Sequence, residues 1–236
     1  MKKFKTSTPT NRTGDHITVV IGNKESRVTL VESEYRFAFG LKNAARVMTK
    51  NARDFSNGET HELRAFVTAA VILSFAYLEA ALNEFIFLNA TASTSTLTAE
   101  EKAIITAIAK EDLRPKGKQN LLQLFNMVLR LLNKPELSED QQPFQDVNVV
   151  RILRNLLVHP EPGRVVTFSE DPNTVLSEQQ KIIKQLRSPL RLNQNATFPR
   201  DVLTSECASW AVSVCEEFLD AFVTQSGVNA GFITSR

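Results

Sequence analysis

The chain has 236 residues, of which 42% are hydrophobic, so it is long enough to bury the core of one large domain. Its formal net charge of +2 is too small for the bulk field alone to indicate binding to nucleic acid or to a membrane surface. The two cysteines, Cys207 and Cys215, and the three histidines show neither a disulfide framework nor the ligand spacing of a zinc site, so we expect no metal and no other cofactor.

The start of the chain and its apolar segments indicate a soluble protein. The basic start MKKFK is followed by TSTPTNRTGD, which differs from the apolar core of a signal peptide. The longest uncharged stretch runs from Ala65 to Leu78, which is 14 residues, short for a membrane span and normal for a buried helix. We therefore expect a cytoplasmic protein with no membrane partner.

The N-terminal region contains a polar arm and two short β-branched runs. Residues 1–14 carry four cations and predict a flexible basic arm, which could touch RNA phosphates but is more often merely solvated. The runs 17–21 (ITVVI) and 27–31 (RVTLV) flank GNKES and predict a β-hairpin. A lone hairpin is marginal in water, so it should lean on helices or pair with a third strand, for which 164–168 (RVVTF) is a candidate.

The remaining chain has helical periodicity. Helices are predicted over about 33–55, 60–89, 99–112, 119–133, 139–159, 178–187 and 199–225. The second of these is apolar nearly all round and should be the central buried helix. Capping boxes are expected at Thr98–Glu101 and Ser138–Gln141, and Gly227 should stop the last helix. These patterns predict a mainly α fold, with residues 15–236 forming one domain that carries the small hairpin.

The stretch 146–161 (DVNVVRILRNLLVHPE) predicts an amphipathic helix with unusual polar chemistry. Six apolar residues share an arc of roughly 160° on a helical wheel and should be buried, and these are Val149, Val150, Ile152, Leu153, Leu156 and Leu157. The opposite arc of roughly 140° holds Arg151, Arg154, Asn155, Val158 and His159. Pro160 disfavours helical geometry at His159 and should end the helix there.

These polar residues have a plain interpretation and a functional one. Arginine and histidine on the outer face of a helix are usually just solvated, and a cation near a helix C-terminus also gains from the macrodipole. The functional interpretation rests on a resemblance. Arg154-Asn155-Leu156-Leu157-Val158-His159 resembles the signature of the HEPN superfamily, which is an arginine, four to six residues and a histidine, often with a polar residue directly after the arginine.

The resemblance implies a HEPN-like antiparallel helical bundle and a metal-independent endoribonuclease that would act as a toxin or phage-defence effector. It implies RNA as substrate, a homodimer with a composite site, and an antitoxin or other regulatory protein as a further partner. Arg154 and His159 would be catalytic with Asn155. Many HEPN toxins carry a tyrosine two residues after the histidine, whereas this chain has Glu161, so neutralisation by modification of that tyrosine is not expected.

The residue chemistry fits cleavage of an RNA phosphodiester by its own 2′-hydroxyl. An imidazole is the side chain whose unperturbed pKa suits proton transfer at neutral pH, and a guanidinium matches two phosphate oxygens. Along a helix the Cα atoms of Arg154 and His159 should be about 8–9 Å apart, which the arginine side chain spans. Asn155 could orient the imidazole or bind a phosphate oxygen, and Arg151 could hold a neighbouring phosphate. One histidine cannot easily be base and acid in one turnover, so a two-fold dimer would supply the second Arg–His pair.

Two polar residues of the apolar helix could support Arg154. Glu79 and Asn83 lie four residues apart in the apolar helix and either form its solvent-facing edge or face Arg154 and orient its guanidinium. No glycine-rich phosphate loop, Gly-x-Ser-x-Gly or DxD motif suggests another enzyme class. The alternatives are a non-catalytic HEPN-like module that binds RNA, a nucleotide or a protein, and a helical scaffold in which Arg154 and His159 have no function.

Overall fold

The computed structural model describes residues 16–21, 24–29, 37–55, 61–91, 96–110, 121–159 and 178–228. The chain divides into two compact units, residues 1–35 and residues 36–236. The predicted basic arm (1–14) and the predicted third strand (164–168) lie outside the described residues.

The N-terminal unit contains a two-stranded antiparallel sheet of β1 (His16–Ile21) and β2 (Lys24–Thr29). The register pairs His16 with Thr29 and Ile21 with Lys24. The second strand therefore begins three residues before the apolar run that predicted it at Arg27. Residues 24–26, which the sequence pattern had assigned to the loop, pair with β1.

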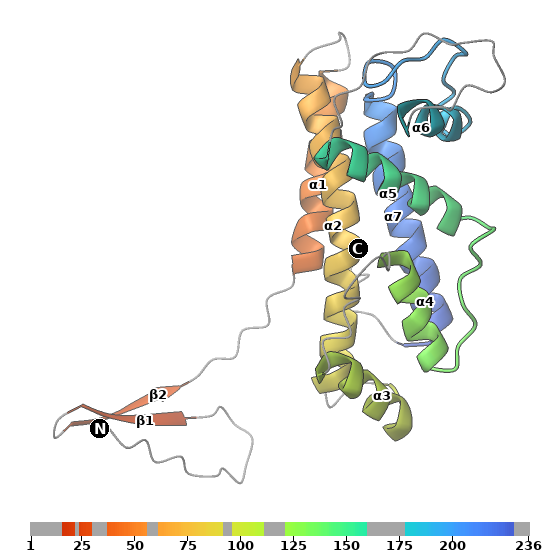
Figure 1. Cartoon of the computed structure of the whole chain (residues 1–236). Coiled ribbons are helices and arrows are strands. Elements are labelled where there is room, and N and C mark those ends of the chain that lie inside the picture. The colour runs from red at the N-terminus through yellow and green to blue at the C-terminus, as the bar shows by residue number, and fades with distance from the viewer. Residues whose placement is uncertain are drawn as a thin grey trace. The chain divides into compact units, whose positions relative to one another are not determined.

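The second unit is helical, so the protein is mainly α as predicted. Its helices are α1 (Phe37–Asp54), α2 (His61–Thr91), α3 (Ala99–Lys110), α4 (Leu121–Leu131), α5 (Phe144–Val158), α6 (Glu178–Leu186) and α7 (Ser205–Ser226). Within this unit α1, α2 and α7 run side by side, and α5 crosses them (Figure 1). Each helix falls within a predicted helical region, apart from two residues at the end of α2 and one at the end of α7.

Helix α2 is the central helix, as its apolar sequence predicted. It packs against α1, α3, α5 and α7 and buries residues all round its circumference. Helix α1 meets α2 through small side chains repeated every seven residues, Ala38, Ala45 and Ala52, which allow close approach of the two backbones. By length and composition alone α2 is also apolar enough to cross a membrane, and half of its most apolar window is buried within the protein.

The predicted helix ends are partly confirmed. Thr98 and Glu101 form the capping box, since the Thr98 N–H donates to Glu101 Oε2 at 2.9 Å and the Glu101 N–H donates to Thr98 Oγ1 at 3.2 Å. Gly227 ends α7 in the left-handed conformation (φ 68°), which glycine adopts without strain.

Two predicted helix starts were wrong. Helix α5 begins at Phe144 after Pro143 with no side-chain cap, so Ser138 and Gln141 do not cap it. Helix α7 begins at Ser205 because Thr204 caps it, accepting a hydrogen bond from the Cys207 N–H at 3.3 Å. Residues 199–204, which were expected to be the first turns of α7, instead form turns before it.

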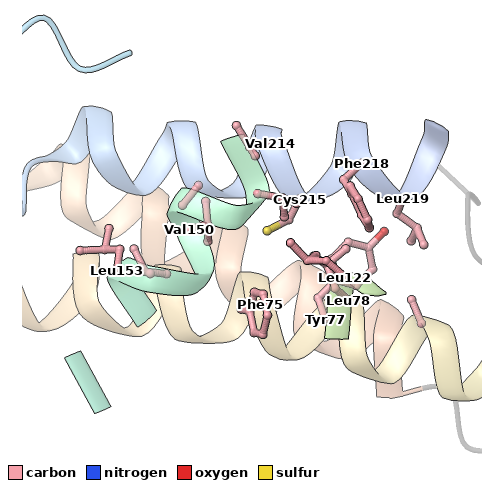
Figure 2. Packing of buried hydrophobic residues seen from close by; sticks show 14 of the residues in the cluster. Phe75, Tyr77, Leu78, Leu122, Val150, Leu153, Val214, Cys215, Phe218 and Leu219 are labelled. Carbon is pink, nitrogen blue, oxygen red and sulfur yellow. The ribbon is translucent and has the colours of Figure 1, made fainter. Parts of the chain in front are cut away.

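The core lies where α4, α5 and α7 meet α2. Phenylalanine rings pack edge to face there, with centroid distances of 5.0 Å for Phe85–Phe222 and 4.8 Å for Phe125–Phe222. Figure 2 shows Val150 and Leu153 of α5 between α7 and α2. These contacts hold α5 across the two long helices and so determine which of its residues reach solvent.

The connection between α4 and α5 is fixed by the buried side chain of Asn126. Its Nδ2 donates to the Leu137 carbonyl at 2.9 Å, and its Oδ1 accepts from the Leu137 N–H at 2.9 Å. Both backbone groups of Leu137 are thereby satisfied by one amide. This pair of hydrogen bonds holds the segment that leads into α5.

Candidate functional site

The buried strip of α5 is narrower than the predicted apolar half. Its fully buried residues are Phe144, Val147, Val150 and Leu153, spaced three apart along the helix. The other four residues of the predicted apolar arc are only partly buried, and these are Val149, Ile152, Leu156 and Leu157. A helix that crosses its neighbours at an angle touches them along a short strip, which the helical wheel does not reveal.

Arg154 is half-buried on α5, on the side that faces α2. Its guanidinium carbon lies 5.8 Å from the centre of the Phe75 ring of α2, within cation–π range. Its Nη1 donates a hydrogen bond to Asn155 Oδ1 at 3.0 Å. A guanidinium has five N–H donors, so this bond leaves four for a ligand. The two contacts hold the guanidinium without pairing it to a carboxylate of any described residue.

His159 lies at the C-terminal end of α5, where the predicted proline stop places it. The helix ends at Val158, and His159 is its C-cap with φ −124° and ψ 66°. Its backbone N–H donates to the Asn155 carbonyl at 2.9 Å, while its side chain is exposed. Asn155 thus contacts Arg154 through its side chain and His159 through its backbone, and it makes no described hydrogen bond to the imidazole.

The supporting residues lie in two places. Glu79 and Asn83 are exposed on α2, one and two turns beyond Phe75, and no hydrogen bond or ion pair joins either of them to Arg154. The described partners of the guanidinium are therefore Phe75 and Asn155. Arg151 lies one turn before Arg154 on α5, and its Nε donates to Asn148 Oδ1 at 3.0 Å.

A polar cleft of about 600 Å³ opens beside the N-terminal half of α5. Arg151 lines the cleft and lies one turn before Arg154, so the cleft is close to the Arg154 end of the helix. The other lining residues come from α4, α5, α6 and the segment before α5, and they are Gln123, Glu139, Phe144, Gln145, Asp146, Asn148, Val149 and Gln185. Burial raises the pKa of Asp146, the half-buried carboxyl in this cleft.

Sequence reasoning missed Phe75 and the cleft. Phe75 precedes Glu79 by four residues, so the α2 face that was considered for Arg154 already contained an aromatic ring. The cleft gave only a weak sequence indication, the amide-rich stretch that includes Gln141, Gln142, Gln145 and Asn148. Its other walls come from α4 and α6, which no local pattern brings to α5.

Other reactive groups do not gather near this face. Cys207 and Cys215 are fully buried in α7, and burial raises the pKa of the Cys207 thiol to about 12. Among the residues that the structure describes, no three His, Cys, Asp or Glu side chains are grouped closely enough to hold a metal ion.

Comparison with family models gave no match, and neither the curated proteins nor the solved structures include one that matches this chain.

Proposed function

We propose that the protein is a metal-independent endoribonuclease of the HEPN type, with a HEPN-like helical bundle and a role as a toxin or phage-defence effector in the cytoplasm. One observation carries the proposal: the guanidinium of Arg154 is held on Phe75 and Asn155 while His159, five residues on, is exposed at the helix end. A held cation and an accessible imidazole on the same helix end are the two groups that this proposed cleavage uses.

The proposed reaction uses the 2′-hydroxyl of RNA as nucleophile. The imidazole of His159 accepts the 2′-hydroxyl proton as the oxygen attacks the adjacent phosphorus. The remaining donors of Arg154 bind the phosphate oxygens, where negative charge accumulates in the transition state. The bond to the 5′-oxygen then breaks, the leaving oxygen takes a proton, and a 2′,3′-cyclic phosphate remains.

The leaving oxygen needs an acid, and we propose that His159 of a second copy supplies it in a two-fold dimer. Exposed apolar residues support such a contact. Val158, next to His159, is 38% exposed, and Phe87, on α2 beyond Asn83, is 57% exposed. Phe87 therefore provides exposed apolar surface on α2, which the polar side of α5 has only at Val158.

Cleavage of a single-stranded RNA by the purified protein, with and without EDTA, tests the proposal. His159→Ala should lower the rate at least about 100-fold, the usual contribution of a general acid or base, while leaving the melting temperature unchanged because the side chain is exposed. His61→Ala is the matched control, since His61 is equally exposed at the start of α2 and should be dispensable.

Three results would contradict the proposal. One is full cleavage by the His159→Ala protein, another is loss of the wild-type activity in EDTA, and the third is a monomeric mass in light scattering for the active form. Stoichiometric RNA binding without turnover would instead support the non-catalytic module. If alanine at both Arg154 and His159 changes nothing measurable, the scaffold interpretation remains.

A further inference from the structure

The cleft beside the N-terminal half of α5 has the size and the polar groups of a nucleotide-binding site. Its volume of about 600 Å³ is within the range of small-molecule sites. Gln123, Gln145, Asn148 and Gln185 supply primary amides, each able to donate and to accept hydrogen bonds. Such groups recognise flat polar molecules through their edges.

Three charged residues line the cleft, Glu139, Asp146 and Arg151, and the two that belong to α5, Asp146 and Arg151, narrow the ligand further. Asp146 is half-buried in the cleft, and no described residue donates a hydrogen bond to it. Both oxygens of its carboxylate can therefore accept hydrogen bonds from a ligand. Arg151 uses its Nε on Asn148, which leaves its two terminal nitrogens as donors. The ligand should therefore present two adjacent donors to a carboxylate and two adjacent acceptors to a guanidinium.

Guanine is the RNA base that has both. Its N1–H and its N2 amine lie side by side and match the two oxygens of a carboxylate, and its O6 and N7 accept from an arginine fork. Uracil has one ring N–H between two carbonyls and no amine. Val149, a half-buried apolar residue of the lining, offers surface to a face of the ring.

We propose that this cleft binds a guanine base of the RNA substrate, with Asp146 on the N1–N2 edge and Arg151 on the O6–N7 edge. The inference rests on the proposed function for its assignment to RNA. Arg151 lines the cleft and lies one helical turn from Arg154, so a base bound there belongs to a nucleotide close to the cleaved phosphate. The cleft would then select where the strand is cut.

Binding of nucleoside monophosphates to the full-length protein, measured by titration calorimetry, tests the cleft independently of catalysis. GMP should bind more tightly than UMP, and IMP, which lacks the N2 amine, should bind about 5-fold or more weakly than GMP. Asp146→Asn should weaken GMP binding about 10-fold. Asp140→Asn is the matched control, because Asp140 is an exposed aspartate nearby that does not line the cleft.

The same proteins with oligonucleotides that contain a single guanosine decide whether the base belongs to the RNA. Cleavage should follow the position of the guanosine and lose that dependence in Asp146→Asn. Equal binding of GMP and UMP, no GMP binding, or wild-type GMP affinity in Asp146→Asn would overturn the proposal. So would GMP binding combined with cleavage indifferent to guanosine.

The two proposals fail separately. An inactive wild-type protein that binds GMP through Asp146 would refute the nuclease and, with it, the assignment of the base to an RNA substrate, while leaving the guanine site itself in place. Cleavage that depends on His159 but not on guanosine would support the nuclease proposal and refute the proposal that the cleft binds a guanine base of the substrate.

Discussion

The two ends of α5 share one buried strip but carry different polar chemistry. At the C-terminal end, Arg154 provides a guanidinium held on Phe75 of α2, and His159 provides an exposed imidazole. At the N-terminal end, amides, Asp146 and Arg151 line a cleft between α4, α5 and α6. In the two proposals, the first end provides proton transfer and charge stabilisation, whereas the second recognises a guanine base. The two proposals therefore place RNA cleavage and recognition of the base at opposite ends of one short helix.

The largest expected effect comes from breaking the strip that both ends share. Leu153→Ala should lower the free energy of unfolding by about 2–5 kcal/mol, because Leu153 is fully buried and its loss leaves a cavity. Cleavage and nucleotide binding should fall together near the lowered melting temperature. Denaturant unfolding measures the change. Leu156→Ala, at a half-buried position three residues on, should cost clearly less, and an equal cost would contradict the narrow strip.

A smaller effect should separate the two ends. Phe75→Leu removes the ring beneath Arg154 and should slow RNA cleavage about 2- to 30-fold, the range of a cation–π contact of about 0.5–2 kcal/mol. Its hydrophobic volume is largely kept, so the melting temperature should change little. GMP affinity serves as the control and should stay at the wild-type value. A parallel loss of GMP binding would show that the two ends do not act separately.

The smallest effect should appear in the pH dependence of stability. Burial raises the pKa of Asp146, so the folded protein holds this proton more strongly than the unfolded chain. Ionisation of Asp146 therefore destabilises the fold, fully above the folded-state pKa and not at all below the unfolded value of about 3.9. Asp146→Asn should slightly raise the melting temperature at pH 7 and lose that advantage by pH 3. An advantage that persists at pH 3 would point to a cause other than ionisation.

The sequence predicted those features that depend on neighbouring residues in the chain. The all-round apolarity of α2 predicted its central position, and Pro160 and Gly227 predicted where α5 and α7 end. Local chemistry was sufficient in these cases because a cap or a stop acts within one turn. The predicted start of α7 was wrong because two nearby residues could each begin the helix. Pro199 was chosen, but Thr204 caps the helix with its side chain.

Features that depend on how helices cross could not be predicted. The wheel of α5 separated apolar from polar residues, but only the crossing of α5 over α2 and α7 decides that Val150 is buried and Ile152 is not. The partner of Arg154 is an aromatic ring 79 positions earlier in the chain, and the cleft needs three helices to form. A single sequence offers no periodicity that reports such distant neighbours.

The side-chain amide of Asn126 fixes the connection between α4 and α5. It imitates the pairing of one strand residue with another and closes a loop whose ends are eleven residues apart. The start of α5 lacks a side-chain cap, so these two hydrogen bonds help to fix the direction in which the chain enters the helix. Aspartate has the same outline but cannot donate the hydrogen bond to the Leu137 carbonyl, so Asn126→Asp would leave that carbonyl without this donor and loosen the segment that leads into α5.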